Sequence, residues 1–383
     1  MEALAFVQML NQLLSRSEAS TKRHIIRLSD PSQFRLLKKT IQRSKGIYKR
    51  LSAVQPLPII SAFVCPVPPC PQLLRKFAGI VSVEEDVKIS VHAFSQPSPV
   101  AGARFRTPFV PSGIRLLRVP SVWNRASGAK VKIGVIDTGV DYQHPDLQSI
   151  LSRGINLVNP RTLPHDDNGH GTHIAGTIAA TGRWGMSGIA PRATIYPVKA
   201  FDHNGSAFVS DIIHGIDWCV QNGVDIINMS FGMRKRSEAM LEAVRNATRS
   251  GVVIVASSGN DGKRGYVDYP ARFAQTISVG AIDSKGKVAH FSNRGKRIDV
   301  YAPGERVLST WPNRRYHEMS GTSMATSHVT GIVALLLSAN PRLTPQQLKQ
   351  IVSLAQVPFS DETKKARLPG RIDAIKAFRR LRS

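Results

Sequence analysis

The chain has 383 residues, of which 42% are hydrophobic and 20% are charged, an ordinary globular composition that excludes a mainly disordered chain. Its length allows two or three domains. It has no apolar run of the roughly 18 residues that a membrane span needs, and its three cysteines are too few for a disulfide scaffold. Lys and Arg outnumber Asp and Glu by 52 to 26, a formal net charge of +26 that concerns the surface and its partners rather than the fold.

The amino-terminal segment, Met1 to Leu14, is moderately apolar but lacks the features of an export signal. Glu2 stands where such a signal carries Lys or Arg, and polar residues interrupt the apolar stretch at Gln8 and Asn11. We therefore predict a leader helix within residues 1–20 and favour a cytoplasmic protein. The alternative is an extracellular protein that leaves the cell by another route.

Residues 21–96 alternate short strands with helices. His24–Leu28 is an apolar strand, and Asp30 followed by Pro31 is typical of a helix start, which predicts a helix to about Arg43. Apolar runs predict three further elements, namely a strand region at 59–67, a short helix at 72–77 and a strand at 87–91. This order indicates a small α+β domain.

Residues 97–112 differ from their surroundings because they contain four prolines and many small residues. Proline removes backbone donors and small side chains offer no core, so we predict an exposed linker. Cys65 and Cys70 flank a proline-rich stretch and leave open either a local disulfide or reduced thiols. Cys219 lies in a predicted helix and is expected to be a buried, unreactive thiol.

Residues 113–383 alternate apolar strands with helices, the pattern of an α/β fold with a parallel sheet and helices on both faces. In such folds ligands bind at the carboxyl ends of the strands, so the polar residues that follow each strand are candidates for a site. The predicted strands are 131–136, 194–198, 225–229, 252–256 and 276–279, and the predicted helices are 172–180, 209–222, 237–250 and 323–339.

Three residues in these positions could carry acyl-transfer chemistry. Asp137 ends the first strand, His170 lies between two glycines at a helix start, and Ser323 opens the long apolar helix. Acyl transfer needs a nucleophilic hydroxyl, a base that takes its proton and a carboxylate that orients the base. An Asp-Thr-Gly segment alone also suits an aspartic protease, but that enzyme needs two such carboxylates and the chain has one copy. His173 is expected to pack on a helix face rather than to bind metal.

The order Asp137, His170, Ser323 and the residues around each of them resemble the subtilisin-like serine proteases, the subtilase family or peptidase family S8, in which the triad follows this order. The resemblance covers about residues 110–357. It implies a serine endopeptidase, a hydrolase that cuts polypeptides through an acyl-enzyme and needs no cofactor for that chemistry. Two alternatives remain: a catalytically inactive binding protein of the same fold and, from the charge alone, a nucleic-acid-associated protein, although no specific nucleic-acid motif is present.

The resemblance also implies which residues bind the substrate. Asn260 resembles the family's amide donor to the oxyanion, and the backbone N–H of Ser323 would be a second donor. An extended substrate would pair with two backbone edges, which a protease can do with any peptide. The residues implied at the edges and the pocket are Ser206, Ala207, Ser230, Phe231, Gly232 and Gly259.

Asp268 precedes Tyr269 and Pro270, which resemble the family segment just past the floor of the primary specificity pocket. A carboxylate at this floor would favour Lys or Arg in the substrate, because an unpaired buried charge is costly. The alternative is an Asp268 in a charged surface loop, together with a moderately hydrophobic preference.

The resemblance suggests one metal, a structural calcium ion. Asp146 matches a calcium ligand of the family, but the loop at 181–186 is shorter than the family's calcium loop and lacks its asparagine, and calcium needs several oxygen ligands. Arg297 stands where a second cation site often has a carboxylate, although Asp299 remains. Calcium is therefore left open.

The domain at 21–96 resembles the family's propeptide in its position and in its order of strands and helices. This implies a zymogen that is inhibited by its own amino-terminal domain, with a tail from about His92 to Pro97 in the active site before cleavage in the linker at 97–112. Parallel sheets fold slowly, which gives such a folding template a physical role. The alternative is an unrelated regulatory domain. We further expect a monomer that acts on polypeptides, with no membrane span and no specific nucleic acid.

Overall fold

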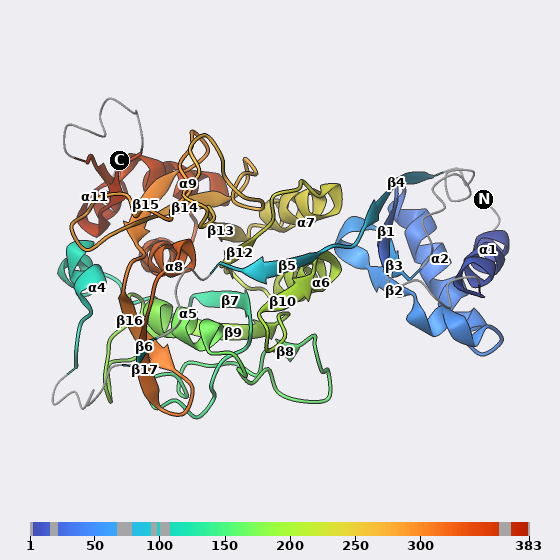
Figure 1. The fold of residues 1–383 in the computed structure, drawn as a ribbon, viewed down its shortest axis with the longest axis horizontal. Helices are drawn as coiled ribbons and strands as arrows, with labels where there is room; N and C mark the ends of the chain where they lie inside the picture. The colour runs from blue at the N-terminus through green and yellow to red at the C-terminus, as the bar shows by residue number, and fades with distance from the viewer. Residues whose placement is uncertain are drawn as a thin grey trace.

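The structure is a computed structural model that describes residues 3–15, 22–66, 79–92, 98–99, 108–359 and 369–381. An amino-terminal domain and a larger carboxyl-terminal domain are joined by a strand that runs from the first into the second (Figure 1). The helix predicted at 72–77 lies outside the described residues, and so does Cys70 of the suggested disulfide. Cys65 is buried and unpaired.

The amino-terminal domain contains an antiparallel sheet with the strand order β2-β3-β1-β4. The carboxylate of Asp30 accepts the backbone N–H of Ser32 and so caps α2, and Pro31 occupies the first turn, where no backbone donor is needed. The elements are α1 (Ala3–Ser15), β1 (His24–Leu28), α2 (Pro31–Ser44), η1 (Lys49–Ala53), β2 (Gln55–Leu57), η2 (Pro58–Ile60), β3 (Ala62–Cys65) and β4 (Ile80–Glu85).

The predicted leader helix is part of this domain. Side chains of α1, among them Phe6 and Leu10, share one core with Ile26 and Phe63 of the sheet and with α2. A segment that contributes so much of the buried apolar surface folds together with the domain. The boundary expected at residue 20 therefore does not separate two folded units.

The larger domain is built on a sheet with the order β18-β19-β15-β14-β13-β11-β7-β9-β8, in which neighbours are parallel except for β18 and β19. Its central strands, such as β13 and β14, are mostly apolar and fully buried because both faces are covered. They are β7 (Lys132–Asp137), β8 (Ile155–Asn156), β9 (Thr194–Lys199), β11 (Ile226–Met229), β13 (Val253–Ser257), β14 (Ile277–Ile282), β15 (Val300–Pro303), β18 (Gln356–Val357) and β19 (Arg371–Ile372).

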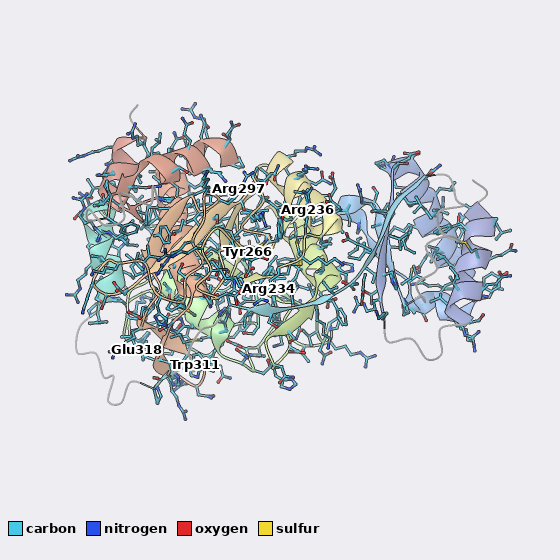
Figure 2. The ribbon with its side chains drawn as sticks, turned by 45° about the horizontal axis from the view of Figure 1, so that its top comes forward. Arg234, Arg236, Tyr266, Arg297, Trp311 and Glu318 are labelled. Atoms are coloured by element: carbon cyan, nitrogen blue, oxygen red, sulfur yellow. The ribbon has the colours of Figure 1, made fainter. Side chains whose placement is uncertain are left out.

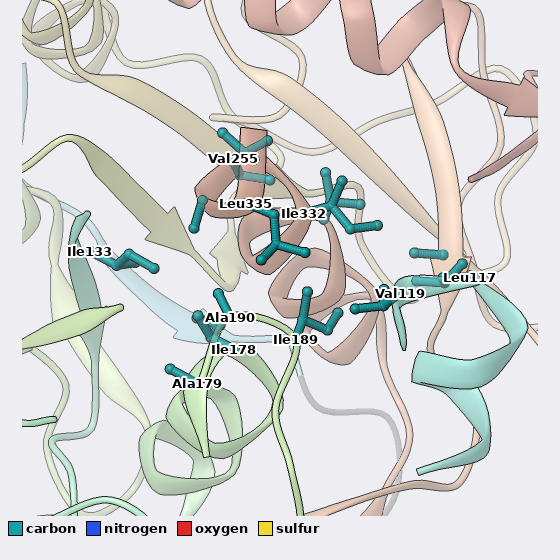
Figure 3. Packing of buried hydrophobic residues seen from close by; sticks show 14 of the residues in the cluster. Leu117, Val119, Ile133, Ile178, Ala179, Ile189, Ala190, Val255, Ile332 and Leu335 are labelled. Carbon is teal, nitrogen blue, oxygen red and sulfur yellow. The ribbon is translucent and has the colours of Figure 1, made fainter. Parts of the chain in front are cut away.

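Helices cover both faces of this sheet. Val255 packs with α5 and α8 on one face, and its neighbour Ile254 packs with α6 and α7 on the other (Figure 3 shows the first of these cores). The helices are α4 (Ser112–Leu116), η3 (Val119–Val122), α5 (His170–Ala179), α6 (Val209–Gln221), α7 (Glu238–Arg249), α8 (Thr322–Ala339), α9 (Pro345–Leu354) and α11 (Ala374–Arg379). The predicted α/β fold is confirmed.

α8 is the one helix in the described part of the chain that is long and apolar enough to cross a membrane by length and composition. Of its span, 89% is buried inside the protein, where it packs on β11, β13, β14 and α5. A central core helix of this kind explains the apolar sequence without a membrane.

The two domains share a large interface. Ile25 and Val64, which point away from α1 and α2, pack against α6 and α7 of the larger domain. Glu84 accepts hydrogen bonds from the Ser237 hydroxyl and from two backbone N–H groups at the start of α7, while Asp86 accepts the backbone N–H and the hydroxyl of Ser210 at the start of α6. Each carboxylate thus lies at the positive end of a helix.

The connecting strand β5 (Lys88–Val91) pairs antiparallel with β10 (Ser206–Phe208) on one side and with β12 (Phe231–Gly232) on the other. Figure 1 shows β5 leaving the amino-terminal domain to lie between these edges. Beyond it, β6 (Ser98–Pro99) pairs with β17 (Arg315–Met319) of the hairpin that β17 forms with β16 (Val307–Trp311). Ser98 and Pro99 are exposed, as predicted for the linker, but Phe109 is half-buried and pairs with Met186.

Candidate active site

Asp137, His170 and Ser323 come from three distant segments and lie at the carboxyl ends of the strands of the large sheet. His170 Nδ1 is 2.7 Å from Asp137 Oδ1, and both side chains are buried. Asp137 Oδ1 also accepts the backbone N–H of Thr138, which fixes the carboxylate. Among the described residues, His170 Nε2 has no hydrogen-bond partner, so it is available as an acceptor once Nδ1 carries the proton.

The glycines on both sides of His170 have a steric reason. A Cβ on Gly171 would be 2.1 Å from the Gly139 carbonyl oxygen and 3.2 Å from Asp137, and a Cβ on Gly169 would overlap the ring of Trp311. Gly169 also has φ +108°, a conformation that favours glycine. Gly169 and Gly171, which have no Cβ, therefore allow the start of α5 to lie close to the end of β7 and to Trp311.

The loop before α5 is held by Asp166, which sequence analysis did not identify. Its Oδ1 accepts the Thr138 hydroxyl and the Gly169 backbone N–H, both at 2.8 Å, and its Oδ2 accepts the backbone N–H and hydroxyl of Thr172. These bonds connect the segment that carries Asp137 to the segment that carries His170. No motif indicated this residue, because its role depends on the fold of the loop.

Ser323 lies in the first turn of α8, and two carbonyl oxygens lie within hydrogen-bond distance of its Oγ, which has one proton to donate. One belongs to Ser230, at 2.8 Å, and the other to His92 of the amino-terminal domain, also at 2.8 Å. Asn260 Nδ2 donates to the same His92 oxygen at 2.9 Å. The Thr322 backbone N–H and hydroxyl both donate to Asn260 Oδ1, which fixes the orientation of the amide.

The predicted substrate edges lie on either side of β5. Ser206 and Ala207 pair with Ser90 and Ile89, while Phe231 and Gly232 pair with Val91 and Ser90. The backbone N–H of His92 donates to the Ser230 carbonyl oxygen at 3.0 Å. The chain of the amino-terminal domain therefore occupies the place of an extended peptide.

Asp268 is buried rather than in an exposed loop, with 5% of its surface accessible. Its Oδ2 is 3.1 Å from His92 Nε2, and a Cβ built on Gly259 would be 2.3 Å from the same oxygen. The structure thus brings Asp268, Gly232 and Gly259 together around the His92 side chain, as a pocket prediction requires.

Two other histidines near the site are structural. His173 Nε2 donates to the Val307 carbonyl oxygen, and His328 Nδ1 donates to that of Met324. Burial lowers the pKa of His173 to about 3 and that of His328 to about 4, so both are neutral. Burial likewise raises the pKa of the Cys65 thiol to about 12, and Cys219 is fully buried, as expected of an unreactive thiol.

Comparison with known proteins agrees with this geometry. The model of the subtilase family, peptidase family S8, matches residues 128–367. The chain belongs to the subtilase family. Subtilisin DY of Bacillus licheniformis is 42% identical over 257 residues, 66% of this chain and 93% of that protein. Subtilisin E of Bacillus subtilis strain 168 is 41% identical over 282 residues, 72% of this chain and 70% of its own length, and the Bacillus pumilus subtilisin is 43% identical over 246 residues, 63% and 89%.

Membership of the subtilase family makes the chain a serine endopeptidase, which confirms the predicted enzyme class and disfavours the inactive alternative. The predicted cytoplasmic location is wrong, because the matched subtilisins are secreted, extracellular enzymes. That prediction depended on the lack of a recognisable export signal at Met1 to Leu14. In this subtilase, residues 3–15 of that segment form α1 and supply core side chains to the amino-terminal domain.

Asp146 of this subtilase has surroundings that do not suit calcium. Its two carboxylate oxygens accept the backbone N–H groups of residues 184–186 at 3.0–3.2 Å and the hydroxyl of Tyr316 at 2.7 Å. Calcium is bound by oxygen ligands, whereas every group around this carboxylate is a donor. In the described part of the chain there is no group of three or more His, Cys, Asp and Glu residues that could hold a metal ion. The metal role expected for Asp146 therefore finds no support.

The second cation position is filled by a side chain. Lys349 Nζ is 3.0 Å from Asp299 Oδ2 and donates to the carbonyl oxygens of Thr276, at 2.5 Å, and Ala274, at 3.0 Å. Three oxygens that could surround a cation thus surround an ammonium group. The charge that an ion would supply is part of the chain.

Part of the positive charge of this subtilase gathers around one cavity of about 600 Å³ behind the Asp268 loop. Arg236, Arg245, Arg272 and Arg297 line it, and Figure 2 shows Arg236 and Arg297 on the same part of the domain as Arg234 and Tyr266. These residues come from separate segments of the sequence, and the fold brings their charges together.

Proposed function

We propose that this serine endopeptidase acts through Asp137, His170 and Ser323, and that it is made as a zymogen that processes itself. The observation that carries the proposal is the convergence of Ser323 Oγ and Asn260 Nδ2 on one peptide carbonyl, that of His92. A nucleophile and an oxyanion donor on the same carbonyl are what acyl transfer requires.

In the proposed reaction the hydroxyl of Ser323 turns towards His170, which removes its proton as Oγ attacks the carbonyl carbon. Asp137 keeps the proton of His170 on Nδ1 and stabilises the imidazolium that forms. Asn260 donates to the oxygen as negative charge develops on it, with the backbone N–H of Ser323 as the predicted second donor. His170 then gives its proton to the leaving amine, and water releases the acyl group. No cofactor takes part.

The amino-terminal domain acts as the inhibitor in this proposal. Its strand β5 is paired on both sides, and its carboxylates Glu84 and Asp86 hold the starts of α7 and α6. A domain bound through a strand, a sheet face and two helix ends excludes other peptides from the cleft. Polypeptides are the proposed substrates, and a monomer remains our prediction.

Mass spectrometry of the purified full chain tests the proposal. We expect the wild-type protein to release an amino-terminal fragment of about 90–110 residues on incubation and the Ser323→Ala variant to stay whole. Ser327→Ala is a matched control, because it makes the same change one turn further along α8, where the hydroxyl donates to the Met324 carbonyl oxygen. Equal processing of wild type and Ser323→Ala would show that another protease makes the cut and would refute self-processing.

A further inference from the structure

His92 is held as the residue whose peptide bond is cut. Its carbonyl oxygen accepts hydrogen bonds from Ser323 and Asn260, and its backbone N–H donates to Ser230. No other bond of the described chain has both a nucleophile and an oxyanion donor on its carbonyl group. The bond that follows His92 is the one to Ala93.

The side chain of His92 is enclosed by the specificity pocket. Its Nδ1 is 2.8 Å from the hydroxyl of Ser257, and its Nε2 is 3.1 Å from Asp268 Oδ2. The ring lies close to the backbone at Gly232, where a Cβ would be 2.3 Å from its Cε1. Only 12% of the His92 side chain is accessible, so the pocket is filled.

These partners match both nitrogens of an imidazole ring and distinguish it from an apolar side chain. An ionised Asp268 can only accept, so Nε2 of the ring carries a proton. The Ser257 hydroxyl can donate to Nδ1 of a neutral ring, or accept from a charged ring while its own proton points to the Phe231 carbonyl oxygen at 3.5 Å. The pocket therefore satisfies both nitrogens in either charge state. A Leu or Phe in the same place would leave the buried carboxylate unpaired.

We infer that this subtilase cuts its own chain between His92 and Ala93, and that Asp268 and Ser257 make its pocket selective for histidine. The inference rests on the proposed function and names the substrate class of the same site. Ile89, three residues before His92, is buried in an apolar cluster with Phe201 and Val209. The test peptides below therefore keep an apolar residue at this position.

The cut balances as an ordinary acyl transfer. Ser323 Oγ bonds to the His92 carbonyl carbon as its proton passes to His170, and the bond from that carbon to the Ala93 nitrogen breaks as the nitrogen takes this proton. Water then adds to the Ser323–His92 ester and gives a proton to His170. Ser323 recovers that proton, and the product is a carboxylic acid on His92, which releases its proton to solvent, and a free amine on Ala93.

This bond differs from the cleavage in the linker at 97–112 that sequence analysis expected. The linker contains Arg104 and Arg106, which a pocket for basic residues could cut. Both lie outside the described residues. A first cut after His92 would leave the linker on the mature chain. The mass of the released fragment distinguishes the two, since it ends at residue 92 in one case and beyond residue 100 in the other.

Peptides test the pocket separately from the maturation cut. We would compare kcat/KM for a chromogenic series Ile-Ser-Val-X with X as His, Lys, Gln or Leu, using the processed enzyme. We expect His to be preferred over Leu by about 10- to 100-fold, because Leu leaves Asp268 unpaired. We expect a smaller preference over Gln, because the amide N–H of Gln can still donate to that carboxylate. Asp268→Asn should bring the His-to-Leu ratio close to one, and Ser257→Ala should lower it less. Asp261→Asn is the matched control, because it removes another carboxylate of the same loop. The Asp261 carboxylate pairs with Arg234 and does not contact His92.

Each result has one meaning. If none of the peptides is cut and wild type matures no faster than Ser323→Ala, the proposed function fails. The peptides could be cut with a kcat/KM for Leu, Gln or Lys that equals or exceeds that for His, or Asp268→Asn could leave the His-to-Leu ratio unchanged. Either result would refute histidine selectivity and leave the proposed protease activity intact. A released fragment that ends elsewhere than His92 in the wild-type chain refutes the assigned bond, and His92→Leu should slow that release by the ratio that the peptides give.

Discussion

Replacing Tyr316 with Phe removes one hydrogen bond from a buried carboxylate without changing the packing volume. The Tyr316 hydroxyl donates to Asp146 Oδ2 at 2.7 Å, and Asp146 is fully buried. A hydrogen bond to a charged group contributes about 1.5–3 kcal/mol, and a domain of this size loses about 2–4 °C in Tm for each kcal/mol. We therefore expect Tyr316→Phe to lower Tm by roughly 3–12 °C.

The measurement is thermal unfolding followed by circular dichroism in a Ser323→Ala background, which prevents self-digestion. Tyr142→Phe is the matched control, because the Tyr142 hydroxyl donates to neutral carbonyl oxygens of residues 152 and 153 and its loss should cost less. Calcium and excess EDTA should both leave Tm unchanged in the Ser323→Ala protein, since donors already surround Asp146.

Calcium binding at Asp146 would give the opposite pattern. In that case calcium would raise Tm with its concentration, as any ligand of the native state does. Asp146→Asn would abolish the increase, and Tyr316→Phe would leave the increase intact. Such a result would refute the argument that the Tyr316 hydroxyl and the backbone N–H groups take the place of the ion.

Three further predictions concern catalysis, inhibition and pH. Asn260→Ala should lower kcat about 10²- to 10³-fold, the loss measured for the corresponding amide in a subtilisin, and should also lower Tm, because it leaves the buried Thr322 donors without their acceptor. Asp86→Ala should weaken inhibition by separately added amino-terminal domain about 5- to 150-fold, because it removes buried hydrogen bonds worth about 1–3 kcal/mol. The pKa values of His173 and His328 are depressed in the fold, so their stabilisation is present above about pH 6.5 and is lost as pH falls towards 4. Urea unfolding of the Ser323→Ala protein between pH 7 and 4.5 should show that its free energy of unfolding falls with pH. The fall should be less steep when His328→Gln is added, and an equal dependence on pH would contradict the role given to His328.

The sequence was sufficient for five strands of the parallel core, but β15 (Val300–Pro303), which is buried in the same sheet, was not predicted. Thr194–Lys199 and Thr322–Ala339 lie within one residue of the predicted ranges, because a strand buried on both faces is a continuous apolar run and a core helix is a long one. Both signals are local. They depend on the burial of each element and not on its partners.

The hairpin of β16 and β17 was not predicted, because its strands mix polar and apolar residues. Its turn contains Asn313 and Arg314, which both have positive φ, as a tight hairpin turn requires. Asparagine is common in such turns, but arginine is not, so the sequence at this position does not indicate a hairpin. The edges β10 and β12 are three and two residues long and form a sheet through β5, more than 100 residues earlier. Pairings of that kind have no local signature.

The site divides in the same way. Asp137, His170 and Ser323 could be proposed from the sequence because each lies in a short motif that resembles the family's. Ser257 could not, because it is one serine inside an apolar strand and its role arises from contact with a residue 165 positions away. Pocket chemistry of this type depends on the tertiary structure.

Inhibition and substrate recognition use the same hydrogen bonds in this fold. β10 and β12 are short edges whose N–H and C=O groups need a partner, and β5 supplies it from within the chain. When β5 leaves, the same groups are free to pair with the backbone of any extended peptide, so the edges provide affinity without choice of sequence. Selection then depends on the side chains that enter the pockets, and in the proposed self-cleavage the residue that fills the main pocket of the uncut chain is itself a substrate side chain.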